Sequence, residues 1–115
     1  ALTFTVARFL ADLHPNYQAM PTVQHSTDHT RFEIIIGNAT AVLEYTRSGT
    51  LMTIHHTYVP VELRGQNIAG LLAKAAFDSA RAEQLQVVPQ CSYIASYAKR
   101  FPAAGALVIK GRVNA

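Results

Sequence analysis

The stretch from Val59 to Leu72 places a polar turn with two glycines between an apolar, β-branched segment and a long helical pattern. A turn of this kind directs free backbone N–H groups and the positive end of the helix dipole toward one point. An anion is the ligand that such a point favours. The sequence therefore predicts an anion-binding turn at the start of this helix.

Two common nucleotide-binding motifs do not fit this turn. Gly65 and Gly70 have the glycine spacing of a nucleoside triphosphate loop. In that loop, Lys and Ser or Thr must follow the second glycine to reach the phosphates and magnesium, and here Leu71 and Leu72 follow it. The dinucleotide fingerprint needs three glycines, and this turn has two. Both motifs are excluded.

Cys91 is the only cysteine of the chain, which excludes an intramolecular disulfide and a multi-thiolate metal site. It ends a short apolar segment, where it or Ser92 would cap the next helix, and the positive end of that helix would favour the thiolate. The thiol is either a small buried apolar group or a nucleophile. The residues alone leave both open.

Two neighbouring histidines lie on a predicted strand before the turn. Because side chains alternate along a strand, only one of His55 and His56 can face a cleft. A neutral imidazole in that place could deprotonate an ammonium group or activate Cys91, and the other interpretation is a hydrogen-bonded strand histidine.

Three strands must position the turn. Apolar runs at 32–36 and 39–46 are separated by Gly37 and Asn38, which indicates a hairpin, and residues 51–59 alternate as a third strand. Consecutive strands joined in this way form an antiparallel meander. One face of the third strand is predicted to carry Met52, Ile54, His56 and Tyr58.

Helical spacing begins after the turn. Apolar and small residues recur at i, i+3, i+4, i+7, i+8, i+11 and i+12 from Ile68 to Ala80, which predicts a helix of about four to five turns with one buried stripe. Residues 85–91 should return parallel to the third strand in a right-handed crossover. A shorter helix should follow and end at Pro102, and residues 106–109 are a candidate last strand.

The first quarter of the chain has a different pattern. Residues 2–13 have the spacing of a short amphipathic helix, and residues 14–29 indicate a loop. We therefore expect an N-terminal extension at 1–29, a domain at 30–109 and a tail at 110–115. The fold class is α/β of the α+β type, with a mixed sheet.

Composition limits the function further. With 115 residues, 50% hydrophobic and 15% charged, the chain is expected to form one globular domain. The dispersed net charge of +3 suits a small polyanionic ligand better than nucleic acid. Because no apolar run or leader stands out, we expect a soluble, cytoplasmic protein, monomeric or weakly dimeric. The spacing of His14, His25 and His29 predicts no metal site.

The turn also fits the spacing Arg/Gln-x-x-Gly-x-Gly/Ala, with Arg64 first, Asn67 in place of the middle glycine and Ala69 last. This resembles the pyrophosphate-binding motif of the GNAT superfamily of acetyl-CoA-dependent N-acetyltransferases. Asparagine is the non-glycine residue that best tolerates a left-handed backbone, so the replacement is physically mild.

Other segments resemble the family in the same order and cover about residues 30–108. They are Arg31-Phe32-Glu33, Leu43-Glu44-Tyr45, His56-Thr57, Val59-Pro60, Leu63-Arg64-Gly65, Val88-Pro89, Cys91-Ser92-Tyr93 and Tyr97 to Pro102. Together they resemble a compact, single-domain subgroup with a cysteine where the strand after the long helix ends.

The resemblance implies a GNAT-like mixed sheet in which CoA inserts where the third and fourth strands splay, and transfer of acetyl from acetyl-CoA to an amine, directly or through Cys91. Cys91, His56 and Tyr97 would surround the reacting centre, with Tyr97 as the acid that protonates the departing thiolate. Residues implied to hold acetyl-CoA are Val59, Arg64, Gly65, Gln66, Asn67, Ile68, Ala69, Gly70, Tyr97 and Arg100. The alternative is a non-catalytic module that binds CoA or acyl-CoA. The sequence does not identify the amine.

Overall fold

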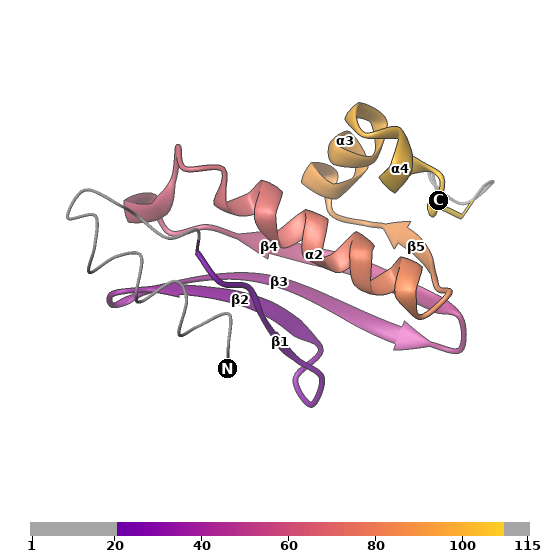
Figure 1. Ribbon diagram of the computed structural model, residues 1–115, viewed down its shortest axis with the longest axis horizontal. Coiled ribbons are helices and arrows are strands. Elements are labelled where there is room, and N and C mark those ends of the chain that lie inside the picture. The colour runs from indigo at the N-terminus through magenta and orange to yellow at the C-terminus, as the bar shows by residue number, and fades with distance from the viewer. Residues whose placement is uncertain (1–20, 110–115) are drawn as a thin grey trace, which may run out of the picture.

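The computed structural model describes residues 21–109, which form one sheet with helices packed against it (Figure 1). The strands are β1 (Gln24–Ser26), β2 (Arg31–Ile36), β3 (Ala39–Ser48), β4 (Leu51–Tyr58) and β5 (Gln86–Pro89). The helices are the 3-10 helix η1 (Val61–Leu63), α2 (Ile68–Ala82), α3 (Ser92–Arg100) and α4 (Pro102–Gly105). The predicted helix at 2–13 and tail at 110–115 lie outside the described residues.

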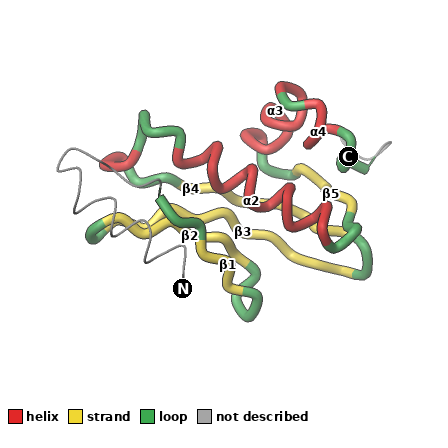
Figure 2. Tube along the Cα trace, viewed as in Figure 1, coloured by secondary structure: helices red, strands yellow, loops and turns green. Residues whose placement is uncertain are grey.

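The five strands follow their chain order in the sheet, β1-β2-β3-β4-β5. All neighbouring pairs are antiparallel except β4 and β5, which are parallel and joined through α2 (Figure 2). The hairpin between β2 and β3 turns at Gly37, whose φ of 60° is a conformation that glycine adopts at little cost. The predicted meander and crossover are therefore confirmed.

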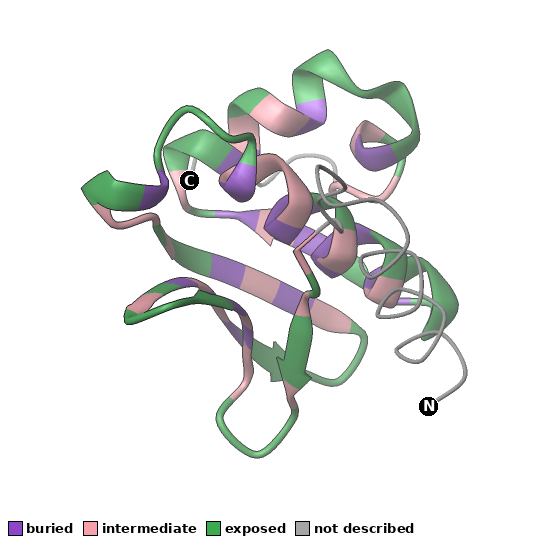
Figure 3. Cartoon of the chain, turned by 60° about the vertical axis from the view of Figure 1, so that its left-hand side comes forward, coloured by how far each residue is buried: buried purple, intermediate pink, exposed green. Residues whose placement is uncertain are grey.

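Helix α2 provides one wall of the core. Its residues Leu72, Ala76 and Ala80 are fully buried against sheet residues such as Ile34 and Leu43. Buried positions alternate with less buried ones along the strands, as one face of the sheet packs on the helices (Figure 3). Among residues 21–109, no helix is long and apolar enough to cross a bilayer.

A β-bulge interrupts the pairing of β3 with β4. Tyr45 pairs with Ile54, and Glu44, the residue before Tyr45, pairs with His56. His55 is therefore the extra residue on β4. A bulge of this kind shifts every later side chain of its strand to the opposite face.

The bulge makes the predicted faces of β4 wrong beyond Ile54. Cross-strand partners share a face, and Thr57 pairs with Leu43, which is fully buried. Thr57 therefore follows Ile54 on the core side. His56 and Tyr58, which alternation alone places beside Ile54, lie on the opposite face of the sheet.

Two predicted segments at the ends also differ from the structure. The loop predicted at 14–29 is wrong at β1, whose three residues pair with β2. The candidate strand at 106–109 reduces to one parallel bridge between Val87 and Val108. Proline suits the first turn of a helix, and Pro102 starts α4, which ends at Gly105. Few residues therefore remain after α4 to form a longer strand.

His25 on β1 is expected to make the stability of the fold depend on pH. Its ring stacks on Phe32 with centroids 4.0 Å apart, and its Nε2 lies 2.7 Å from the hydroxyl of Tyr45. Partial burial lowers the pKa of His25 below its ordinary value of 6.5. Unfolding therefore takes up a proton below pH 6.5, so this contribution to stability is present above pH 6.5 and is lost as the pH falls through the folded pKa.

Urea unfolding measured between pH 8 and 5 tests this expectation. We expect the wild type to lose a small part of its free energy of unfolding below pH 6.5, because the ring remains partly exposed. His25→Gln should show a flatter profile in that window, and the matched variant His55→Gln should keep the wild-type slope. Equal slopes for wild type and His25→Gln would contradict the prediction.

Candidate functional site

The turn between η1 and α2 has the left-handed backbone that the sequence suggests. Gly65 has a φ of 84°, and Asn67, the N-cap of α2, has φ 59° and ψ 29°. Among non-glycine residues, asparagine is enriched in this conformation. The expectation that Asn67 can replace glycine in the turn is therefore confirmed at the level of the backbone.

The turn leaves a run of backbone donors without acceptors. The first bond into α2 runs from the N–H of Leu71 to the carbonyl of Asn67, 3.1 Å away, and the N–H of Arg64 bonds Val61. Between these two bonds, the N–H groups of residues 65–70 have no hydrogen-bond acceptor within residues 21–109. Such donors at the positive end of a helix dipole favour an anion.

Asn67 and Gly70 fit each other across the first turn of α2. A Cβ added to Gly70 would lie 2.3 Å from Oδ1 of Asn67. The carboxamide of Asn67 therefore lies directly over the space that the missing Gly70 side chain leaves. Position 70 requires glycine because any side chain there would collide with Asn67. Position 65 requires glycine because its backbone has a positive φ.

A hollow of about 250 Å³ opens at this turn. Most residues predicted to hold a cofactor line it. The lining residues are Val59, Leu63, Arg64, Gly65, Asn67, Ile68, Ala69, Gly70 and Tyr93. Three predicted residues, Gln66, Tyr97 and Arg100, do not line it. The side-chain amide of Gln66 instead donates to the carbonyl of Glu62, 3.5 Å away.

Arg64 both lines the hollow and braces the turn. Its Nε donates to the carbonyl of Val59, 2.9 Å away, which ties the end of β4 to the turn. The rest of its exposed guanidinium can contact an anion held at the N–H groups. Tyr93, which is absent from the predicted site residues, comes from the start of α3 and also lines the hollow.

A second hollow of about 220 Å³ continues from the first, sharing Asn67, Gly70 and Tyr93. It brings the predicted residues Tyr97 and Arg100 together. Its lining is Asn67, Gly70, Leu71, Lys74, Tyr93, Tyr97, Arg100 and Phe101. Two cations and three aromatic rings around one hollow suit a phosphate and a planar base.

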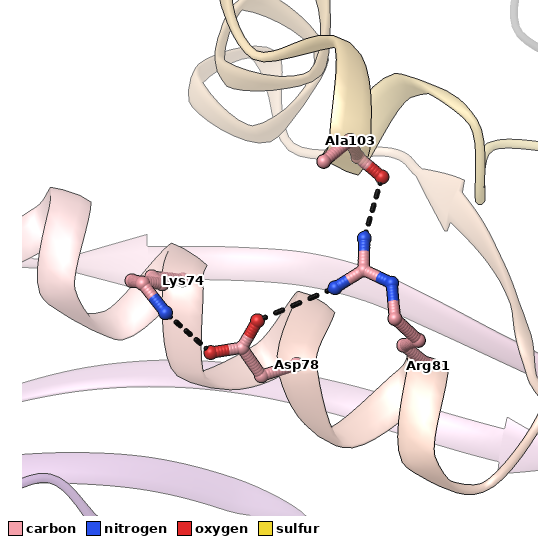
Figure 4. Close-up of polar contacts among 4 residues, drawn as sticks. All are labelled: Lys74, Asp78, Arg81 and Ala103. Carbon is pink, nitrogen blue, oxygen red and sulfur yellow. Dashed lines mark hydrogen bonds and ion pairs between the residues drawn. The ribbon is translucent and has the colours of Figure 1, made fainter.

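Lys74 is a cation of this hollow that is absent from the predicted site residues. Its Nζ lies 2.7 Å from Asp78, and the same carboxylate contacts Arg81, which donates to the carbonyl of Ala103 at 2.7 Å (Figure 4). The hydrogen bond to Asp78 raises the pKa of Lys74. The chain of contacts links α2 to α4 and holds a charged lysine beside the hollow.

Tyr97 packs among aromatic rings on the α2 side of α3. Its ring centroid lies 5.7 Å from that of Phe77 and 4.5 Å from that of Phe101. Partial burial raises the pKa of Tyr97, which keeps the phenol protonated to higher pH. A protonated phenol suits a general acid, but that role stays a prediction.

Cys91 lies where β4 and β5 separate. Their pairing ends at Ile54 and Pro89, and the N–H of Cys91 still bonds the carbonyl of Ile54 at 3.0 Å. Beyond that point β4 continues without β5, and Cys91 becomes the N-cap of α3. The half-buried thiol lies 3.6 Å from the hydroxyl of Thr57, a neighbour that the bulge at His55 brings to this side.

The structure does not bring His56 to Cys91. His56 is exposed on the sheet face opposite to Thr57, beside its cross-strand partner Glu44. Within residues 21–109, no group of three or more His, Cys, Asp or Glu side chains could hold a metal. The predicted site residues therefore divide into four parts. They are the turn with free N–H groups at 65–70, named the anion turn after its predicted ligand, an aromatic and cationic hollow, a thiol and a separate imidazole.

Comparisons with known proteins bear on the same region. The sequence model of the GCN5-related N-acetyl-transferase family matches residues 31–107, from β2 to just beyond α4. Protein NATD1 of Mus musculus is 36% identical over 83 residues, which are 70% of this chain and 76% of that protein. NATD1 of Homo sapiens is also 36% identical over 83 residues, with 74% of its length covered.

A solved structure shares the fold. The NMR solution structure of a GCN5-like protein from Staphylococcus aureus superposes with a TM-score of 0.64. The match covers 80% of this chain and 91% of that one, at 23% sequence identity. The matched range of the family includes the turn, α2 and β5.

Proposed function

Because the chain belongs to the GCN5-related N-acetyltransferase family, we propose that it transfers acetyl from acetyl-CoA to a primary amine. The observation that supports cofactor binding most directly is the run of N–H groups at 65–70 beside Arg64, without acceptors among the described residues. The pyrophosphate of CoA carries the charge and the several acceptor oxygens that this turn can bind.

The neighbouring features suggest how the rest of the cofactor lies. In our proposal the phosphorylated adenosine end enters the second hollow, near Lys74 and Arg100, where the exposed ring of Phe101 can stack on the base. The pantetheine arm then follows Val59 to the unpaired edge of β4. This path ends at Cys91, so the thioester would reach the point where β5 departs.

We propose direct transfer, with Cys91 lining the acetyl pocket. An adjacent base is one means of activating a nucleophilic thiol, and the side-chain partner of Cys91 is the hydroxyl of Thr57, which is not a base. His56, the candidate base, lies on the opposite face of the sheet. Attack on the thioester by the amine itself requires no such pair.

Intact mass after incubation with acetyl-CoA tests the role of Cys91. We expect no acetyl adduct on the wild type, and we expect Cys91→Ala to keep kcat within about tenfold, because it loses packing in the acetyl pocket and no covalent step. Cys91→Ser is the matched control that retains a small polar group. A stable adduct that disappears in Cys91→Ala, together with loss of turnover, would contradict direct transfer.

The proposed activity is tested by combining calorimetry with a transfer assay. CoA and acetyl-CoA should bind in a saturable manner, and a screen of primary amines should release CoA thiol in a protein-dependent way. Tight binding of CoA with no turnover on any amine would favour the alternative, a non-catalytic CoA-binding module. Absence of CoA binding would overturn both.

A further inference from the structure

We propose that the acceptor is a short aliphatic diamine, bound on the face of the sheet opposite α2. This inference rests on the proposed acetyltransferase activity and adds the substrate class and the residues that select it. The acceptor face, as we name it, consists of Arg31, Glu33, Val42, Glu44, His56 and Tyr58.

The strand register aligns this face in two rows across β2, β3 and β4. Arg31 pairs with Glu44, which pairs with His56 in the first row. In the second row, Val42 pairs with Tyr58 on one side and with Glu33 on the other. Because neighbouring strands lie about 5 Å apart, Glu44 is one strand spacing from His56.

The charges of this face favour a cation. Arg31 contacts Glu33 at 3.3 Å, so this pair is neutral overall. Glu44 is half-buried, and its carboxylate has no ion pair or hydrogen bond to any residue of the range 21–109. Because this half-buried carboxylate has no partner among the described residues, it can bind an ammonium group, although the net charge of the chain is +3.

Apolar surface beside these charges suits an aliphatic body. Val42 is half-buried and lies on the same face of β3 as Glu44, and its cross-strand partner Tyr58 is 48% exposed. A methylene chain can pack on these two side chains, and an ammonium group gains from the face of an aromatic ring. A ligand that carries a carboxylate in place of the second ammonium group would be repelled by Glu44.

The position of the thioester explains why the amine would arrive from this face. The anion turn and both hollows are built by the helices that cover the core side of the sheet. Thr57 and Cys91 meet on that side, where β5 leaves β4. Beyond Ile54 the edge of β4 is open, so an amine beside His56 can approach a thioester in this gap from the other face.

In this arrangement the two nitrogens of the diamine have different roles. The ammonium that does not react binds Glu44, and the reacting ammonium gives one proton to the neutral imidazole of His56, which passes it to water. The free amine attacks the thioester carbonyl, so that a carbon–nitrogen bond forms and the carbon–sulfur bond breaks. The second proton lost by this nitrogen goes to the departing thiolate, giving CoA thiol and the monoacetylated diamine.

The test compares three acceptors of matched length with wild type and Glu44→Gln. They are 1,4-diaminobutane, n-butylamine without the second charge, and 4-aminobutyrate with the opposite charge. We expect kcat/KM of the wild type for the diamine to exceed that for butylamine by about tenfold, the effect of one charge-assisted hydrogen bond, and 4-aminobutyrate to be the poorest. Glu44→Gln should remove this preference.

Controls separate this inference from the proposed function. Glu83→Gln, an exposed carboxylate at the end of α2, should keep the diamine preference, and the Kd for CoA should be the same in wild type and Glu44→Gln. His56→Gln should lower kcat for both amines by about a hundredfold or more.

An NMR titration of the CoA complex with 1,4-diaminobutane gives a readout besides turnover. We expect saturable shifts of the backbone amides at 42–44 and 56–58 in the wild type and their loss in Glu44→Gln. Equal kcat/KM for diamine and butylamine, a preference that survives in Glu44→Gln, preferred acetylation of a peptide lysine, or no saturable diamine binding would each overturn the inference. CoA binding at the turn would remain in all of these cases.

Discussion

Arg64→Ala is expected to raise the Kd for CoA by about ten- to a hundredfold. Its guanidinium lines the hollow at the anion turn, and a hydrogen bond to a charged group contributes roughly 1.5–3 kcal/mol. The variant also loses the bond from Nε to the carbonyl of Val59, which fixes the turn to β4. Calorimetry with CoA at one fixed ionic strength measures the effect, since salt screens exposed charges.

Three variants make this prediction specific. Arg64→Lys keeps the charge but not the planar fork or the Nε bond, so we expect an intermediate Kd. Arg47→Ala removes an exposed arginine that pairs with Glu83 at the far end of α2 and should leave the Kd unchanged. Asn67→Gly should bind CoA more tightly, because it relieves the left-handed φ of 59° and removes the carboxamide that lies over Gly70. If Arg64→Ala and Asn67→Gly both bind CoA as the wild type does, the cofactor site lies elsewhere.

Leu72→Ala is expected to lower the free energy of unfolding by about 2–5 kcal/mol. Leu72 is fully buried between α2 and the sheet, so its removal loses apolar contacts and leaves a cavity that the close-packed core fills only in part. At about 4–8 °C per kcal/mol for a domain near this size, we expect the Tm to fall by roughly 8–40 °C. Urea titration and thermal melts measure both quantities.

The neighbouring residue provides the control for this second prediction. Leu71 is chemically identical but only half-buried at the edge of the same core. Leu71→Ala should therefore lose clearly less free energy of unfolding than Leu72→Ala, with a similar m-value in both. Equal losses would mean that α2 packs on the sheet by a different stripe from the one in the structure.

The difference between these leucines also shows the limit of helical periodicity. The predicted stripe includes Leu71 and Ala75, whereas the buried positions of α2 are centred one residue further, with Ala73 and Phe77 inside the core. Helical periodicity indicates that α2 has an apolar face, but two stripes shifted by one residue share many of the same positions. Periodicity alone therefore does not show which stripe is buried. The sheet and α3, against which Phe77 stacks on Tyr97, select between them.

Local sequence is sufficient to predict those parts of the fold whose conformation depends on residues adjacent in the chain. The hairpin at Gly37 and the start of α2 after Asn67 follow from glycine and asparagine conformations and from apolar spacing. The anion turn is predictable for the same reason, because its donors are backbone groups whose direction depends on the turn itself.

Side-chain contacts between separate strands and helices could not be predicted from local sequence. Tyr93 and Lys74 contribute to the hollows only because α3 packs beside α2, a contact that no local pattern encodes. The pairing of Cys91 with Thr57 likewise needs β5 to end beside Ile54. Residues like these carry no sequence signal that distinguishes them from ordinary helix and strand positions.

The sequence by itself determined the family resemblance, the turn before α2 and the order of the sheet, since each follows from local motifs and from their order along the chain. Only the tertiary structure decided which side of the sheet each reactive group occupies. The reason is the bulge at His55, one extra residue that moves Thr57 to the thiol of Cys91 and sends His56 to the opposite face beside Glu44. Strand alternation cannot reveal that residue, because its presence depends on the register with β3.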